Sequence, residues 1–294
     1  MARKADRESR TRETPRIGTR KQLDRLRTMS TSEMIPFARR AFALARAEIA
    51  ALGALLVVAL GSLTFADLAE DMGEPDGQVF DTRLLHVLRP YADDPSRPWG
   101  PWWLKEAASD ITSLGGISVL ALFATIVIVF LLIQRKWLSS VLLVVGLGGG
   151  VILSEGLKAV FERDRPPVIY QATETINASF PSGHALLSAV FYLSLGVMLT
   201  RAFPQRRFKA YVLGVGIVIT LLIGVTRIYL GAHWASDVFA GWSVGAAWAM
   251  ALWLVSYAVS RRQRRLHAPL QDEANAEPVS ASADGLHQGR VKER

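Results

Sequence analysis

Cysteine is absent from all 294 residues of this chain. Disulfide bridges, iron–sulfur clusters and thiolate catalysis are therefore excluded. The first forty residues also lack an apolar stretch, because the first hydrophobic run begins only near Ile49. We therefore expect no cleaved signal peptide in this region. The apolar runs in turn lack the polar stripes at helical spacing that a soluble helical bundle requires.

Hydrophobic residues make up 50% of the sequence, and the mean hydropathy is +0.23. These residues gather in runs close to the roughly 20 residues that a helix needs to cross a bilayer. The runs cover about residues 47–67, 111–133, 137–160, 185–200, 210–226 and 238–259. The pattern predicts an all-α polytopic membrane protein with six transmembrane helices in a bundle.

The net charge of +8 comes from basic residues near the two ends of the chain and in alternate connectors between the apolar runs. By the positive-inside rule, these connectors and both termini are expected in the cytoplasm, and a bacterial inner membrane fits this pattern. We expect a disordered basic arm at 1–40, a six-helix membrane domain at 41–260 and a disordered tail at 261–294. The basic residues concerned are Arg39, Arg40, Arg46, Arg135, Lys136, Arg201, Arg206, Arg207, Lys209, Arg261, Arg262, Arg264 and Arg265.

The first outer connector is expected to contain a short interfacial helix. Apolar residues at helical spacing within residues 79–88 favour a helix that lies along the membrane surface. Trp99, Trp102 and Trp103 would then anchor the next span at the interface. A lid that guides a lipid tail is the functional alternative for this segment.

Three short polar segments adjoin the apolar runs, and on this topology all three lie outside the cytoplasm. The first segment, KAVFERDRP, carries Lys158 about two helical turns before Arg165. Lys158 lies near a helix end that favours a cation, and Pro166 then breaks the helix. The structural alternative is a snorkelling lysine beside a boundary arginine.

The second segment is PSGH, at the start of an apolar run. Ser182 is a natural N-cap, and Gly183 lets the backbone approach a ligand closely. The N–H groups of this first turn point outward as an anion site, with His184 beside them. A capped helix with a histidine in its first turn is the alternative that needs no ligand.

The third segment, TRIYLGAHWASD, contains His233 and Asp237 four residues apart, so on a helix the two share one face. The carboxylate can then orient the imidazole and leave its other nitrogen free to attack. Arg227 adds a fork of donors suited to phosphate oxygens. A polar pair at an interface is the structural alternative. Nearby Arg163 would solvate its loop or add charge for a second phosphate.

A metal centre is the chemical alternative for the same residues. His184, His233 and Asp237 could form a set of two histidines and one carboxylate. The three cations Lys158, Arg165 and Arg227, directed at the same point, would repel a divalent ion, so we expect no metal and no cofactor. Nucleic acid is not an expected partner either, because the positive charge lies on the wrong side and near few aromatic residues. Three cations around an attacking imidazole favour phosphoryl transfer.

At these residues the sequence resembles the type 2 phosphatidic acid phosphatase family of membrane lipid phosphate phosphatases. The family signature is a Lys, six residues and Arg-Pro; then Pro-Ser-Gly-His; then Ser-Arg, five residues, His, three residues and Asp. All three parts occur here in order and at the correct spacing. The one departure is Thr226 in place of Ser, and Thr keeps the hydroxyl. The resemblance covers the core from the first span to the sixth and leaves out both ends of the chain.

The resemblance implies that His233 attacks phosphorus and forms a phosphohistidine, with Asp237 orienting it and His184 protonating the leaving group. The remaining motif residues would bind the phosphoryl oxygens. These residues are Lys158, Arg165, Ser182, Gly183 and Arg227. It also implies that the reaction needs no metal. The expected substrate is a phospholipid or polyprenyl phosphate in the bilayer, such as phosphatidic acid, phosphatidylglycerol phosphate or polyprenyl pyrophosphate.

Three alternatives remain for the function. The same site could pass phosphate from one lipid to another, which would make the protein a phosphotransferase. A non-enzymatic lipid transporter would bind its substrate at midspan charges, whereas the charges here lie at helix ends. The soluble vanadium haloperoxidases have a similar site, but six predicted spans argue against them. The oligomeric state is not predicted.

Overall fold

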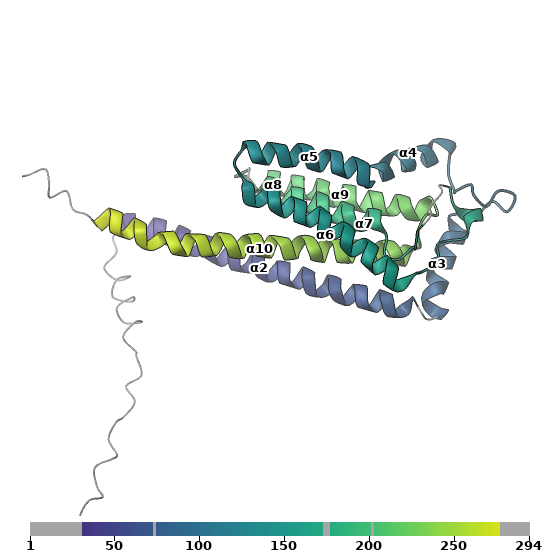
Figure 1. The fold of residues 1–294 in the computed structure, drawn as a ribbon, viewed down its shortest axis with the longest axis horizontal. Coiled ribbons are helices and arrows are strands. Elements are labelled where there is room, and N and C mark those ends of the chain that lie inside the picture. The colour runs from purple at the N-terminus through teal and green to yellow at the C-terminus, as the bar shows by residue number, and fades with distance from the viewer. Residues whose placement is uncertain (1–30, 73–74, 173–176, 201–202, 277–294) are drawn as a thin grey trace, which may run out of the picture. The chain divides into compact units, whose positions relative to one another are not determined.

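The computed structural model describes residues 31–72, 75–172, 177–200 and 203–276, and every regular element in these ranges is helical (Figure 1). The predicted all-α fold is confirmed. Residues 51–294 form one compact unit, and residues 1–50 form another. In chain order the elements are α2 (Thr31–Asp71), α3 (Pro75–Val87), α4 (Trp102–Ser113), α5 (Ile117–Ile133), α6 (Trp137–Phe161), η1 (Val168–Tyr170), α7 (Gly183–Ser188), η2 (Ala189–Leu193), α8 (Ser194–Thr200), α9 (Arg206–Tyr229) and α10 (Ala235–Ala276).

Among the described residues, five helices are long and apolar enough to cross a membrane. α4 and α5, which are bent by 46° at a short break, pass the same test of length and composition only as a pair, and they make a sixth span if the pair crosses as one. Many large apolar side chains of these helices are exposed, as in α5, where Ile133 is 74% exposed. Such a band of exposed apolar surface is covered by lipid in a membrane protein. The five spans are Glu48–Asp71, Trp137–Phe161, Gly183–Thr200, Arg206–Tyr229 and Ala235–Gln263.

The span Gly183–Thr200 lies in the core of the bundle, where it packs against α6, α9 and α10. Small residues let the helices approach closely, as expected in lipid, where no hydrophobic force drives helices together and close packing must hold them. A Cβ at Gly245 of α10 would lie 2.5 Å from the carbonyl oxygen of Leu186, so no side chain fits there. The buried core residues are Leu120, Ala124, Leu143, Leu186, Leu187, Val190, Phe191, Tyr192 and Ile223.

An aromatic cluster joins α2 to the bundle. The ring of Phe65 stacks on Phe180 with the centroids 5.5 Å apart, and it meets the edge of Phe161 at 5.9 Å. Phe161 ends α6, and Phe180 lies just before the PSGH segment. The first span therefore supports two of the three motif segments through packing.

The second span is not the single helix over residues 111–133 that the sequence predicts. It is broken at residues 114–116, between α4 and α5. At the break, a Cβ on Gly115 would lie 2.5 Å from Cγ2 of Ile223 and 3.4 Å from the carbonyl oxygen of His184. The absence of a side chain lets the backbone of the break lie directly against α7 and α9.

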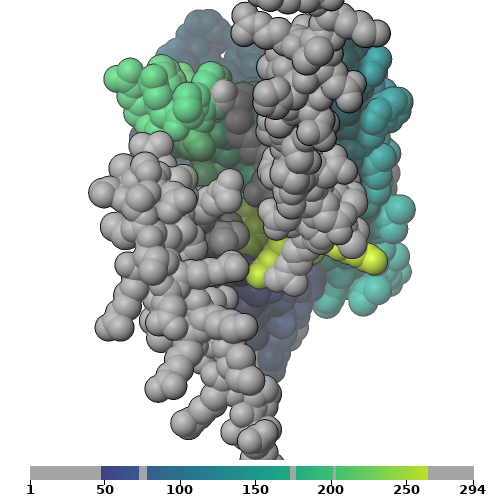
Figure 2. All heavy atoms as spheres, turned by 90° about the vertical axis from the view of Figure 1, so that its left-hand side faces the viewer, coloured from purple at the N-terminus to yellow at the C-terminus, as the bar shows by residue number. Residues whose placement is uncertain are grey.

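The two ends of the bundle carry different connections. In Figure 1, α3, α4 and the connection between α9 and α10 lie towards the right-hand end, whereas the turns from α5 to α6 and from α8 to α9 lie at the left. Figure 2 looks at this left-hand end, with green atoms of α9 on one side of α10 and the teal atoms of α5 and α6 on the other. The basic turns before α6 and before α9 therefore lie at the end opposite α3.

Two helices extend beyond the predicted membrane domain. α2 begins at Thr31, so residues 31–40 are helical where the sequence analysis expects a disordered arm. α10 continues to Ala276, past the predicted domain end at 260. The extension of α10 is rich in Ala, Arg, Gln and Leu, which have high helix propensity, so its charge does not end the helix. Residues 1–30 and 277–294 lie outside the described residues, and their disorder stays a prediction.

Candidate active site

The first motif segment forms the end of α6 and the loop that follows it. Lys158 lies in the last turn of α6, as predicted, and Glu162 ends the helix in the left-handed conformation with φ of 43°. Nζ of Lys158 lies 2.7 Å from Oε1 of Glu155, so the lysine is paired with a carboxylate one turn earlier. Half of the Glu155 side chain is exposed, which weakens this pair and lets an anion compete for the lysine.

Arg165 reaches from this loop to the turn that precedes α10. Its Nη1 donates to the carbonyl oxygen of Ala232 at 2.7 Å and lies 3.2 Å from Nε2 of His233. Its Nε donates to the carbonyl oxygen of Asn177. A guanidinium can only donate, so the ring nitrogen that faces it accepts. The neutral ring of His233 therefore carries its proton on Nδ1.

His233 and Asp237 are brought together, although not on a shared helix face. α10 begins at Ala235, so the histidine lies in the turn before the helix. Its Nδ1 is 3.4 Å from Oδ2 of Asp237. The same oxygen accepts hydrogen bonds from the backbone N–H of Trp234 at 2.9 Å and from the hydroxyl of Ser179. These donors hold the buried carboxylate behind the ring.

Burial decides the protonation state of His233, which is only 3% exposed. Loss of hydration lowers its pKa to about 4; Asp237 partly opposes this shift, and the nearby Arg227 and Arg165 add to it. The imidazole is therefore neutral near pH 7. A neutral ring with a lone pair on Nε2 is the form that can act as a nucleophile.

The PSGH segment is fixed to α10 through its backbone. Ser182 is the N-cap residue of α7, as predicted, but its hydroxyl makes no capping hydrogen bond. Its backbone N–H donates instead to the carbonyl oxygen of Asp237 at 2.9 Å. A Cβ at Gly241 would lie 2.6 Å from the carbonyl oxygen of Ser182, so glycine is needed for this close approach.

The three motif segments meet around a cavity of about 520 Å³. Six of the eight predicted site residues line it, and Ser182 and Asp237 lie fully buried next to them. Arg227 lies in the last turn of α9, and its buried Nε has no hydrogen-bond partner in the protein. The lining residues are Gly115, Ile117, Val151, Ser154, Glu155, Lys158, Arg165, Asn177, Gly183, His184, Leu187, Arg227 and His233.

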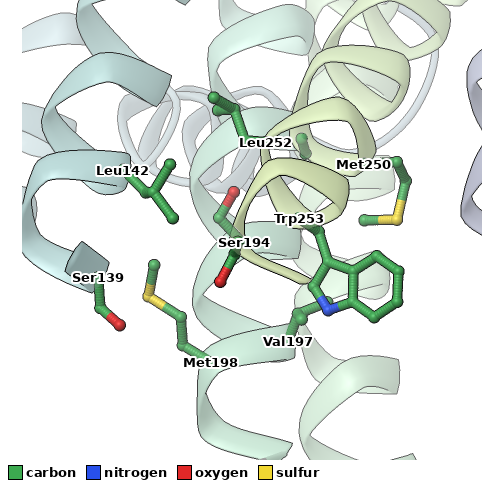
Figure 3. Close-up of a pocket in the computed structure, with 10 residues that line it drawn as sticks. Ser139, Leu142, Ser194, Val197, Met198, Met250, Leu252 and Trp253 are labelled. Carbon is green, nitrogen blue, oxygen red and sulfur yellow. The ribbon is translucent and has the colours of Figure 1, made fainter. Parts of the chain in front are cut away.

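A second cavity, of about 40 Å³, lies between α6, α8 and α10 (Figure 3). Its lining includes Ser139, Ser194, Met198 and Trp253 and contains no titratable side chain. It therefore offers no acid, base or fixed charge for catalysis. The charged cavity is the candidate active site.

The interpretation of Arg163 as a solvating residue, or as charge for a second phosphate, is wrong. Its Nη1 donates to Oδ1 of Asp237 at 2.5 Å and to the hydroxyl of Ser236 at 2.7 Å. Its Nη2 donates to Oδ2 of Asp81 at 2.9 Å. Asp81 also accepts from the backbone N–H of Ser236 at 3.0 Å. The arginine is thus occupied on both sides by buried carboxylates.

Asp81 belongs to α3, the short helix that the sequence predicts after the first span. Its side chain is buried and bonded to Arg163 and to the start of α10, so α3 is held at this point, and a lid function of the segment stays a hypothesis. The sequence analysis missed Asp81 and Ser179. One signal for Asp81 was present: the carboxylate occupies the same face of the predicted helix as Leu84, Leu85 and Leu88. A charge on an apolar helix face indicates a buried partner.

The described part of the chain contains no group of three or more His, Asp or Glu residues that could hold a metal ion. The alternative ligand set of His184, His233 and Asp237 therefore does not form as a cluster. Arg165 faces one nitrogen of His233, and Asp237 faces the other.

Residues 137–261 match the PAP2 superfamily. Over 147 residues the chain is 33% identical to phosphatidylglycerophosphatase B of Bacillus subtilis (strain 168), an alignment that covers 49% of this chain and 70% of that protein. It is 30% identical over 121 residues to undecaprenyl-diphosphatase of Sulfolobus acidocaldarius, covering 40% of this chain and 54% of that protein.

The fold is similar to the crystal structure of a transmembrane PAP2-type phosphatidylglycerolphosphate phosphatase from Bacillus subtilis. The TM-score is 0.63 at 26% identity, and the match covers 69% of this chain and 96% of that chain. The helical fold with its apolar spans and this likeness define an integral membrane phosphatase. The chain belongs to the PAP2 superfamily, which confirms the resemblance seen in the three motif segments.

Proposed function

We propose that this protein removes the terminal phosphate from a lipid phosphate or lipid pyrophosphate through a phosphohistidine on His233. One observation carries the proposal. The neutral ring of His233 lies at the wall of a cavity that is also lined by Lys158, Arg165 and Arg227, and Asp237 lies behind its Nδ1. A nucleophile with three fixed cations around one cavity suits a phosphoryl group, because positive charge stabilises the oxygens during transfer.

In the first step, Nε2 of His233 attacks phosphorus while the bond from phosphorus to the leaving oxygen breaks. Arg165 must first move its hydrogen bond from Nε2 to a phosphoryl oxygen, since its Nη1 is 3.2 Å from the attacking atom. The negative charge of the bound headgroup favours the protonated ring of His184 in the same cavity, and this ring gives its proton to the leaving oxygen. General acid catalysis of this kind contributes about 10²–10⁴ in rate. The Nδ1 proton stays towards Asp237, whose carboxylate balances the charge that the ring gains.

In the second step, a water molecule attacks the phosphorus of the phosphohistidine. His184, now neutral, accepts a proton from this water, and the bond between phosphorus and Nε2 breaks. The products are inorganic phosphate and the original neutral ring of His233. The same histidine thus acts first as an acid and then as a base.

The positive groups of the cavity supply the charge stabilisation in both steps. Lys158 would leave Glu155 for a phosphoryl oxygen, and Arg227 has an unpaired Nε available for another. Ser182 and Gly183 would bring the backbone of the PSGH turn close to the phosphoryl oxygens. In this proposal the fixed cations do the work that a metal ion does in other phosphoryl transfer enzymes, so the reaction needs no metal.

The substrate class is supported by the relatives. One is named for phosphatidylglycerophosphate and the other for undecaprenyl diphosphate. Phosphatidylglycerol phosphate, polyprenyl pyrophosphate and phosphatidic acid are therefore the candidates, with the headgroup in the cavity and the tail between helices in the bilayer.

We further propose that the protein lies in a bacterial inner membrane with both termini in the cytoplasm and the cavity on the opposite side. The basic turns before α6 and before α9 support this orientation, because they lie at the end of the bundle opposite α3. The cavity belongs to the α3 end, since Arg163 beside it is bonded to Asp81. Lipids of the outer leaflet would then reach the site directly.

The test is a panel of the three candidate lipids presented in detergent to the purified full-length protein. Release of inorganic phosphate, with an excess of chelator leaving the rate unchanged, is the expected result. Each lipid product is followed in parallel, because transfer of phosphate to another lipid would appear as a new labelled lipid without free phosphate. If the protein released phosphate from none of the three lipids, the proposal would be overturned.

A further inference from the structure

Ser154 is a buried hydroxyl residue in the wall of the active-site cavity, and it lies outside all three motif segments. Five buried side-chain polar atoms in the described part of the chain have no hydrogen-bond partner in the protein. Two of them, Oγ of Ser154 and Nε of Arg227, belong to residues that line this cavity. Arg227 is a motif residue, whereas no role above uses Ser154.

Several other hydroxyl residues on the helices are satisfied locally, whereas Thr112 of α4 is also buried without a partner but does not line the cavity. Ser109, Thr125 and Ser140 each donate to the carbonyl oxygen four residues earlier, at distances from 2.8 to 3.3 Å. Such a bond is the usual solution for a hydroxyl within a helix. Ser154 makes no such bond, although it is only 2% exposed and lies inside α6. A buried hydroxyl without a partner costs free energy that a ligand oxygen would recover.

One face of α6 places this hydroxyl beside the phosphate-binding groups. Val151, Ser154, Glu155 and Lys158 all line the cavity, and their spacing is that of one helical face. A Cβ built on Gly183 would lie 3.2 Å from Oγ of Ser154 and 3.6 Å from Nζ of Lys158. The hydroxyl, the ammonium group and the backbone of the PSGH turn therefore meet at one place.

We infer that Ser154 donates a hydrogen bond to a non-bridging phosphoryl oxygen of the substrate, next to Lys158. This inference rests on the proposed function, since the oxygen belongs to the terminal phosphate of the lipid. A hydroxyl suits this position because it donates without adding a cation beside Lys158. It also has no negative charge, unlike its neighbour Glu155, and so does not repel the phosphate.

The competing explanation is that Ser154 is a small residue needed only for close packing of α6 on the PSGH turn. The two explanations differ in the effect of Ser154→Ala. Alanine is smaller and a better helix former, and it removes a hydroxyl without a partner, so stability should be unchanged or slightly higher in both cases. Only a hydroxyl that binds phosphate would lower the affinity for the anion when it is removed.

The experiment measures binding of inorganic phosphate and of orthovanadate to the purified full-length protein, together with KM and kcat for the lipid that it hydrolyses. Ser154→Ala is compared with Ser140→Ala, which lies on the same helix, is equally buried and donates to the carbonyl oxygen of Lys136. A hydrogen bond to a charged group changes affinity by about ten- to a hundredfold. We expect a loss of about tenfold or more for both anions with Ser154→Ala and no change with Ser140→Ala.

A second variant tests whether a packing defect explains the loss of anion affinity. Ser154→Cys keeps the shape of the side chain but has a weak donor, so it should also lose anion affinity while its thermal unfolding stays that of the parent protein. Equal phosphate and vanadate binding by Ser154→Ala and the parent would overturn the inference, as would a parent protein that binds neither anion. A parent that binds both anions but hydrolyses none of the lipids would overturn the proposed function alone, and the binding comparison would still decide the role of Ser154.

Discussion

Arg163 donates a hydrogen bond from Nη1 to Oδ1 of Asp237 across 2.5 Å, on the side of the carboxylate away from His233. The other nitrogen of the same guanidinium holds Asp81 of α3 at 2.9 Å. The carboxylate behind the proposed nucleophile is therefore positioned by a chain of charges that begins on a different helix. Both side-chain oxygens of Asp237 are engaged, which leaves the carboxylate little freedom to rotate away from the ring.

Asp81→Asn should lower kcat by about ten- to a hundredfold and leave KM nearly unchanged. The substitution removes the charge that holds Arg163, so Asp237 and His233 lose their alignment, and misplacement by about 1 Å has effects of this size. The cations that bind phosphate are not touched. Steady-state kinetics measure both constants, with Asp93→Asn as the control, since Asp93 is an exposed carboxylate in the same connector. A rise in KM with an unchanged kcat would contradict this role.

His233→Ala should abolish phosphate release, with a loss of roughly a thousandfold or more, as is usual when a nucleophile is removed. The parent protein, quenched in base during turnover of a labelled lipid, should carry phosphate on His233, and the variant should carry none. His86→Ala is the matched control, because His86 is an exposed histidine on α3 outside the cavity. Full turnover by a folded, correctly inserted His233→Ala protein would disprove the nucleophile.

Arg227→Lys should lower kcat/KM by about tenfold or more. A lysine keeps the charge but loses the planar fork of donors, including the buried Nε that has no partner in the protein. The assay compares it with Arg206→Lys, at the exposed start of the same helix, which should behave as the parent does. Near-normal activity of Arg227→Lys would mean that this residue serves structure and does not bind phosphate.

The activity should persist in acid well below the ordinary pKa of histidine. Burial lowers the pKa of His233 to about 4, so its ring stays neutral and nucleophilic as the pH falls through 6.5 and becomes protonated only as the pH falls through 4. The acid limb of kcat/KM, corrected for the separately measured ionisation of the lipid phosphate, should therefore lie near pH 4. A limb assigned to His233 near pH 6.5 would indicate a hydrated ring and contradict this burial.

Gly231→Ala should destabilise the turn that carries His233. Gly231 has φ of 66°, and an added Cβ would lie 2.4 Å from the carbonyl oxygen of Tyr170. Strain of this kind costs about 1–3 kcal/mol, so thermal unfolding should occur at a lower temperature. Gly214→Ala is the control, since its Cβ would meet nothing within 4 Å in α9 and alanine favours the helix. Equal unfolding temperatures for the two variants would show that the turn relaxes.

Much of the site could be predicted because its chemistry is concentrated in short segments. The length of the apolar runs predicts the spans, and the distribution of arginine and lysine predicts that the segments with Lys158, His184 and His233 lie on one side. The structure places these three residues around one cavity. The pairing of His233 with Asp237 also followed from their spacing, although the histidine lies before the helix and not on it.

The contacts that sequence reasoning missed join residues far apart in the chain. Spacing could not identify the carboxylate on α3 that holds Arg163, because the choice depends on how α3 packs against α10. The break between α4 and α5 was likewise missed, since Gly115 and Gly116 lie within an apolar run where glycine is common in membrane helices. At that break the backbone of Gly115 lies close to Ile223 and His184, and this tertiary contact cannot be read from the sequence.

The backbone hydrogen bond from Ser182 to Asp237 has a consequence for the timing of catalysis. The turn proposed to receive the phosphate and the residue proposed to orient the nucleophile are joined by main-chain atoms, so a shift of one should carry the other. On the proposed function, binding of the lipid would require only side-chain adjustments, such as release of Lys158 from Glu155, and the reaction centre would be assembled before the headgroup enters.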